Sequence, residues 1–105
     1  MGENIDMSYP TRTVSSGEKE LHLKRTILRL PAVKIQSGLS RSTIYARIAA
    51  GLWPRPIGLG GHCVGWPADE VAKINSARIA GLTDGDIRVL VKQLETDRKN
   101  TTILN

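Results

Sequence analysis

The chain has 105 residues, of which 40% are apolar, so it is long enough for one small domain with a single core. No run approaches the roughly 20 apolar residues of a membrane span, and the N-terminus lacks the apolar stretch of a signal peptide. The single cysteine, Cys63, excludes an internal disulfide and suits a reducing compartment. We therefore expect a soluble, cytoplasmic protein.

The formal net charge is +5, and it is distributed unevenly. Basic and acidic residues balance in residues 1–26 and again in residues 67–105. Residues 27–66 contain no aspartate or glutamate and five basic residues: Arg29, Lys34, Arg41, Arg47 and Arg55. A surface of this sign attracts polyanions, of which nucleic acid is the commonest. The alternative is a chance clustering of solubilising charge.

The N-terminal part of the chain predicts a tail followed by a short strand. Residues 1–26 are polar, mixed in charge and without helical periodicity, which indicates a flexible tail. The alternation of Leu28 and Leu30 then predicts a strand over residues 27–30. Pro31 suits the first turn of a helix, because no amide hydrogen is needed there.

Two helices joined by a tight turn follow this strand. The first covers residues 31–37, and Gly38 can close it in the left-handed conformation. Ser40 is expected to cap a second helix, in which Ile44 and Ile48 form the buried stripe. This is the helix-turn-helix arrangement, whose second helix docks in the major groove of DNA. The polar side chains of that helix are hydroxyls and guanidiniums, which suit phosphates and base edges.

Residues 53–67 predict a β-hairpin. Apolar residues alternate on both sides of Gly60 and Gly61, which are expected to form a two-residue turn. Pro54 and Pro56 restrict the first strand to a sheet edge. A hairpin directly after a recognition helix is a wing, whose backbone amides can contact phosphate. The rival interpretation as a nucleotide-binding loop lacks the P-loop lysine and the helix that should follow.

Two further helices are predicted after the hairpin. Pro67 begins the first, and Gly81 ends it. Thr83 and Asp86 predict a capping arrangement for the second, which covers residues 84–98. The inward-facing residues of the two helices recur at helical spacing: Val71, Ile74 and Ala77 in the first, and Ile87, Leu90, Val91 and Leu94 in the second. The stripe of the last helix either folds back on the domain or packs against a second copy, so a homodimer through residues 84–98 is an open alternative.

The expected fold is therefore mainly α with a small β-hairpin, a winged helix-turn-helix in residues 27–81 followed by a C-terminal helix in residues 82–105. The residues expected to contact DNA are Ser40, Arg41, Ser42, Thr43, Tyr45, Arg47, Arg55, Gly60, Gly61 and His62. The alternative for each exposed member is an ordinary solvated side chain.

Individual members of this set have different expected roles. Arg41, at the start of the recognition helix, is expected to contact a base or a phosphate, and Ser42 and Thr43 to face the groove. Arg47 and Arg55 are expected to contact backbone phosphate without sequence information.

Aromatic and titratable residues allow two interpretations each. Tyr45 can pack its ring on the edge of the core and hydrogen-bond a phosphate, or serve packing alone. His62 can add charge at low pH or be an inert turn residue. Trp53 and Trp66 are expected in the core rather than as stacking platforms. Cys63 is expected to be a small buried apolar residue.

Four segments, in the order "LRLPAV", "GLSRSTIY", "PRPIGLGG" and "VGWPADEV", resemble the AlpA family of phage and prophage regulators over roughly residues 27–81. That family is related in fold to MerR-type and excisionase winged helices. The resemblance implies a small DNA-binding protein that activates or represses prophage genes, some affecting integrase expression or excision. The positions matching its DNA-facing helix, wing turn and junction into the third helix are Ser40, Arg41, Ser42, Thr43, Tyr45, Gly60, Gly61, Trp66 and Pro67. The chain departs from the family at Ala46 and His62, where basic residues are expected.

The leading hypothesis is a sequence-specific regulator that binds double-stranded DNA near a phage promoter. A second is an excisionase-like architectural factor that bends DNA, and a third is an adaptor whose basic block docks an acidic protein. No carboxylate pair, metal-ligand set or nucleophile with a base is apparent, so neither an enzyme nor a cofactor is expected. Contacts with an integrase or with RNA polymerase would fit the first two hypotheses.

Overall fold

A computed structural model of the chain describes residues 25–103, so the tail predicted for residues 1–26 lies almost wholly outside the described residues. The elements, in chain order, are β2 (Ile27–Leu28), α3 (Leu30–Ser37), α4 (Arg41–Ala49), β3 (Ile57–Gly60), β4 (Cys63–Pro67), α5 (Ala68–Ile79) and α6 (Asp84–Ile103). The fold is mainly helical with a small antiparallel sheet, as the sequence predicts for a winged helix-turn-helix.

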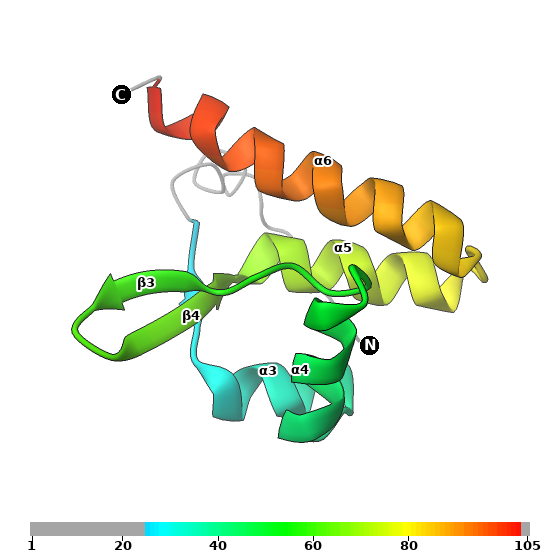
Figure 1. Ribbon diagram of the computed structural model, residues 1–105, viewed down its shortest axis with the longest axis horizontal. Helices are drawn as coiled ribbons and strands as arrows, with labels where there is room; N and C mark the ends of the chain where they lie inside the picture. The colour runs from blue at the N-terminus through cyan, green and yellow to red at the C-terminus, as the bar shows by residue number, and fades with distance from the viewer. Residues whose placement is uncertain (1–24, 104–105) are drawn as a thin grey trace, which may run out of the picture.

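The elements form two layers with the hairpin projecting at one end. Helices α5 and α6 lie side by side in one layer, and α3 and α4 lie in the other (Figure 1). The β3–β4 hairpin extends beyond the helices, and the strand β2 links the sheet to α3 (Figure 1). No helix among residues 25–103 is long and apolar enough to cross a membrane.

The sheet has the strand order β2-β4-β3, with both pairings antiparallel. β3 is therefore an edge strand, as the prolines before it predict. The hairpin turn is Gly61 and His62 rather than Gly60 and Gly61, because Gly60 still pairs with Cys63. Gly60 and Gly61 both have positive φ, at 109° and 58°, which explains why glycine occupies both positions.

Strand β2 is shorter than predicted because Leu30 already belongs to α3, whose first turn contains the proline. Its pairing with β4 demands a glycine at position 65. A Cβ there would lie 2.6 Å from Cγ2 of Ile27 and 2.9 Å from the carbonyl oxygen of Leu28. The close approach of the two backbones thus fixes Gly65 sterically.

The predicted signals of the helix-turn-helix are confirmed. Gly38 has φ 74° and its N–H donates to the carbonyl of Lys34, which closes α3. Ser40 Oγ accepts a hydrogen bond from the Thr43 N–H at 3.2 Å, so it caps α4. Ile44 is fully buried beneath α4.

One core joins the two layers. Its buried apolar members are Val33, Ile44, Trp53, Trp66, Val71, Ile74, Ala77, Ile87, Val91 and Leu94. The two tryptophans are in this core, as predicted, whereas Cys63 is exposed, so its predicted burial is wrong. The reason is position: Cys63 lies next to the hairpin turn, beyond the helices that cover the base of the sheet.

Helix α6 folds back on its own domain. Its buried residues Ile87, Val91 and Leu94 pack in the common core, and the Thr83 hydroxyl accepts from the Asp86 N–H at 3.2 Å to cap it. The helix runs to Ile103 rather than ending at residue 98. Of the two alternatives for the apolar stripe, the intramolecular one is confirmed, and a homodimer through residues 84–98 would need another face of the helix.

A buried ion pair fastens α6 to α5. The Glu70 side chain is only 1% exposed, and Arg98 reaches it from α6 with Nη2 2.6 Å from Oε1 and Nε 2.9 Å from Oε2. The same guanidinium donates to the carbonyl of Arg55 at 2.8 Å, in the segment between α4 and β3. Arg98 therefore joins three parts of the chain at one point.

Candidate nucleic-acid interface

Helix α4 turns its first residues to the surface. Arg41, Ser42, Tyr45 and Ala46 are exposed, while Thr43 is half-buried. This orientation follows from Ile44 and from the partly buried Ile48, which anchor the opposite side of the helix in the core. The predicted set of α4 contacts is thus presented by a helix whose rotation is fixed.

Arg41 is held by a chain of aromatic contacts. Its Cζ lies 5.1 Å from the centroid of the Tyr45 ring, a cation–π arrangement. The Tyr45 ring meets the Trp66 ring edge-on, with centroids 6.3 Å apart and an interplanar angle of 70°. The Trp66 indole N–H donates to the Pro54 carbonyl at 2.9 Å. The expected packing of Tyr45 at the edge of the core is confirmed, and its bond to phosphate stays a prediction.

The hydroxyls at the start of α4 differ in their remaining capacity to form hydrogen bonds. Ser40 Oγ accepts from the Thr43 amide, donates to Thr43 Oγ1 at 3.0 Å and lies 3.3 Å from Ser42 Oγ. Its capacity is largely used in capping the helix. Ser42 is exposed and retains more capacity for an outside partner.

The tip of the β3–β4 hairpin is exposed to solvent. Gly60, Gly61 and His62 are all exposed there. At its base, Arg29 Nε donates to the Val64 carbonyl at 2.9 Å, so an exposed guanidinium from the β2–α3 junction lies against β4. Sequence reasoning did not select Arg29 as a contact residue, although its place in the acid-free block was the available signal.

Arg47 lies on a different flank of α4 from Arg41. It comes two positions after Tyr45, about 200° further around the helix. There it lines a hollow of about 400 Å³ together with Leu39 and with Asn75 of α5. Arg41 and Arg47 are six positions apart, so they lie on different flanks of α4, about 120° apart around its axis.

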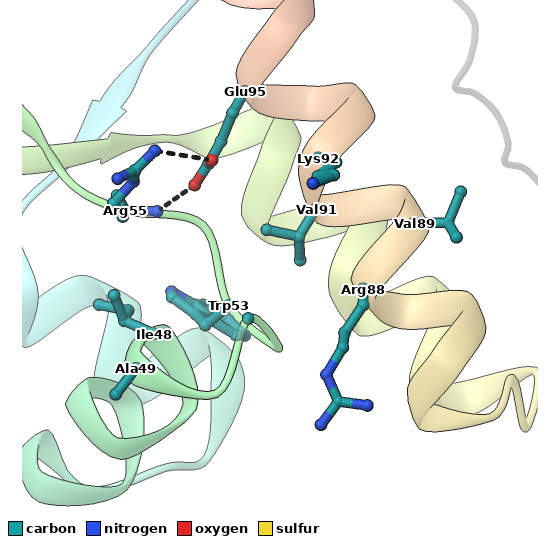
Figure 2. A pocket seen from close by; sticks show the side chains of 10 residues that line it. Ile48, Ala49, Trp53, Arg55, Arg88, Val89, Val91, Lys92 and Glu95 are labelled. Carbon is teal, nitrogen blue, oxygen red and sulfur yellow. Dashed lines mark hydrogen bonds and ion pairs between the residues drawn. The ribbon is translucent and has the colours of Figure 1, made fainter.

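Arg55 is engaged with α6. Its Nη2 lies 3.5 Å from Glu95 Oε1, and its backbone N–H donates to Glu95 Oε2 at 2.8 Å (Figure 2). The Arg55 side chain is nevertheless 75% exposed. A phosphate would have to compete with this carboxylate, which makes Arg55 a weaker candidate than Arg29 or Arg41.

Residues 26–79, just over half of the chain, match the family described as prophage CP4-57 regulatory protein (AlpA). The chain belongs to the AlpA family. This AlpA family chain is also 47% identical over 58 residues to a protein of Enterobacteria phage P4 described as uncharacterized protein ORF88. The aligned part is 55% of this chain and 66% of that protein, slightly less than two thirds of its length. No solved structure matches the chain.

The family match runs from the start of β2 to the end of α5 and stops before α6. All the elements that carry the predicted contacts of this AlpA family chain lie inside it. The resemblance stated from "GLSRSTIY" and the neighbouring segments is thereby confirmed. The two departures are both at exposed positions, Ala46 on α4 and His62 at the hairpin tip.

The carboxylates are confined to one of the two layers. Among residues 25–103, every aspartate and glutamate lies on α5 or α6: Asp69, Glu70, Asp84, Asp86, Glu95 and Asp97. The elements β2, α3, α4, β3 and β4 carry none, so the charged residues of these elements are all basic. No group of three or more His, Cys, Asp or Glu within the described range could hold a metal ion.

Proposed function

We propose that the chain is a sequence-specific regulator of phage or prophage genes that binds double-stranded DNA. In this proposal α4 enters the major groove with its first turn, and the β3–β4 hairpin lies along the backbone as a wing. Membership of the AlpA family supports a regulatory role. The observation that carries DNA binding is the layer without carboxylates from which α4 and the hairpin project.

The contacts around Arg41 support a role in reading sequence. A guanidinium at the start of a recognition helix is placed where base edges are nearest. The Tyr45 ring beneath it, 5.1 Å away, restricts its movement, so less entropy is lost when it forms a bidentate bond to guanine. Arg29, which is bonded to the hairpin backbone, is instead proposed to contact phosphate.

The test begins with a protection footprint on DNA flanking the gene, followed by anisotropy titrations of the protected duplex and of a scrambled duplex. Arg41→Ala should lose about 1–3 kcal/mol of binding free energy on the protected duplex and much less on the scrambled one. Arg29→Ala should weaken both alike and reduce the salt slope by about one unit.

Lys73→Ala is the matched control, because it removes the same charge from an exposed position on α5. It should keep the affinity and selectivity of the original chain. Equal losses for Arg41→Ala and Lys73→Ala would mean that only bulk charge matters, and the recognition-helix assignment would then be abandoned. A chain that fails to bind long duplexes at low ionic strength would end the DNA-binding proposal itself.

A further inference from the structure

A groove separates the C-terminal end of α4 from α6. Its volume is about 480 Å³. Ile48 and Ala49 line it from α4, Trp53 from the following loop, and Val89 and Val91 from α6 (Figure 2). Val91 points from α6 toward Trp53, whereas the Val89 side chain, which is 69% exposed, points to the other side of the helix (Figure 2). Because Ala49 is exposed and Ile48 is half-buried, the floor is apolar and partly open to solvent.

The rim of the groove is basic. Arg88 and Lys92 lie along it on α6, while the Glu95 carboxylate is occupied by Arg55. Arg88 Nε donates to the Ala50 carbonyl at 2.9 Å, and its aliphatic stem lies beside Gly51. These contacts hold the guanidinium so that its two terminal nitrogens point away from α6 into the open side of the groove (Figure 2). A fixed guanidinium fork suits a carboxylate.

The chain itself presents the complementary surface at the α5–α6 turn. Ile79 is 87% exposed and Leu82 is 38% exposed. Asp84 and Asp86 follow immediately and are exposed as well, and Asp84 Oδ1 is paired with Arg78 Nη1 at 3.0 Å. Three other exposed aliphatic residues, Ile27, Ile35 and Leu59, lie in the acid-free block. This turn therefore combines exposed apolar side chains with the exposed carboxylate of Asp86, whereas the carboxylate that lines the groove, Glu95, is paired with Arg55.

We propose that the groove between α4 and α6 receives the α5–α6 turn, residues 79–86, of a second copy of the chain. The apolar side chains of the turn cover the open floor, and the Asp86 carboxylate faces Arg88 and Lys92. The contact differs from a dimer through the buried stripe of α6, because that stripe is covered by α5. It also leaves Arg41 free, since the groove lies at the other end of α4.

The positions of the two surfaces allow a reciprocal pair. The carboxylates of the turn and the basic rim both belong to the first half of α6, so they lie close together on one molecule. Two copies related by a two-fold axis can then exchange both contacts at once. If the geometry permits only one contact per pair, the copies associate head to tail. The solution mass distinguishes these forms, and either form is the proposed contact.

The experiment is a dilution series of the full chain without DNA, followed by amide chemical shifts. Each surface has few residues, so association should be weak and visible between about 20 µM and 1 mM. The expected shifts cluster at Gly51, Ile79, Leu82 and Val89. Because no DNA is present, failure of this proposal and failure of DNA binding are separate results.

Charge reversal on each surface tests the contact directly. Arg88→Glu alters the groove and Asp86→Lys alters the turn, and each alone should abolish the concentration dependence. Mixing the two variants should restore it, since every turn then faces a groove of opposite charge. Lys73→Glu makes the same charge change as Arg88→Glu at an exposed site on α5 and should leave the association intact.

Two results would overturn the proposal. The first is a set of shifts that do not change with concentration up to about 1 mM, where even weak association is detectable. The second is association that survives both charge reversals, which would place the contact on another surface. If Arg88→Glu lowers DNA affinity while the chain never self-associates, the groove belongs to the DNA footprint instead.

Discussion

Replacing Arg98 by alanine should destabilise the fold far more than other arginine-to-alanine changes. The substitution removes two short bonds, of 2.6 and 2.9 Å, to a Glu70 side chain that is 1% exposed. Removing one partner of a buried ion pair costs about 3–5 kcal/mol, because the remaining charge is left desolvated. Arg25 Nη2, 3.7 Å from Glu70 Oε2, offsets part of this, so we expect about 3 kcal/mol.

Urea denaturation followed by circular dichroism at neutral pH measures this loss as a shift of the midpoint at constant slope. Arg55→Ala is the control, because its ion pair with Glu95 is 75% exposed on the arginine side and should contribute no more than about 1 kcal/mol. The double variant Glu70→Met with Arg98→Met should regain most of the stability, because no buried charge remains.

The stability loss of Arg98→Ala relative to that of Arg55→Ala shows whether the Glu70–Arg98 pair is shielded from water. A loss for Arg98→Ala no larger than that of the control would show that water reaches the Glu70 carboxylate and that the pair does not lock α6 to α5. Total stabilities of small domains are about 5–15 kcal/mol, so a loss of the expected size is easily resolved.

Two further substitutions, each with a comparison variant, test the local geometry of the layer without carboxylates. Ser40→Ala should lower the free energy of unfolding by about 0.5–2 kcal/mol, because it removes the N-cap of α4. Ser40→Asn should keep most of the original stability, since asparagine also caps helices. Equal melting temperatures for the original chain and both variants would disprove the capping role. Gly65→Ala should cost about 1–3 kcal/mol, because the new Cβ meets a backbone oxygen of β2 that no rotamer change can move. Gly58→Ala is the control, because a Cβ at position 58 would have no other heavy atom within 4 Å, so its effect on stability should be close to zero in the same thermal unfolding assay. Similar losses of stability at positions 58 and 65 would contradict the steric argument.

The local parts of the fold were predictable because their signals are short in range. The caps at Gly38 and Ser40, the spacing of Ile44 and Ile48, and the glycine-rich hairpin each depend on residues a few positions apart. The hairpin turn was misplaced by one residue, since two adjacent glycines with positive φ look alike in sequence although only one belongs to the turn.

The parts that could not be predicted depend on residues far apart in the chain. Glu70 and Arg98 are separated by 28 positions, and Arg55 and Glu95 by 40. No periodicity encodes which of several arginines meets which carboxylate. For the candidate interface, the acid-free block was visible in the sequence, but the engagement of Arg55 by α6 was not. That contact depends on how α6 packs, which only the folded chain determines.

Trp66 has a consequence for how the chain could adapt to a target. Its ring is in contact with Tyr45 of α4, its strand β4 forms one side of the β3–β4 hairpin, and its indole N–H donates to the Pro54 carbonyl in the segment between them. Trp66 thus connects α4 to the hairpin, so we expect the two to move together and not independently. A duplex whose grooves do not match this fixed spacing would have to bend or twist to fit, so the flexibility of the DNA would enter its selection.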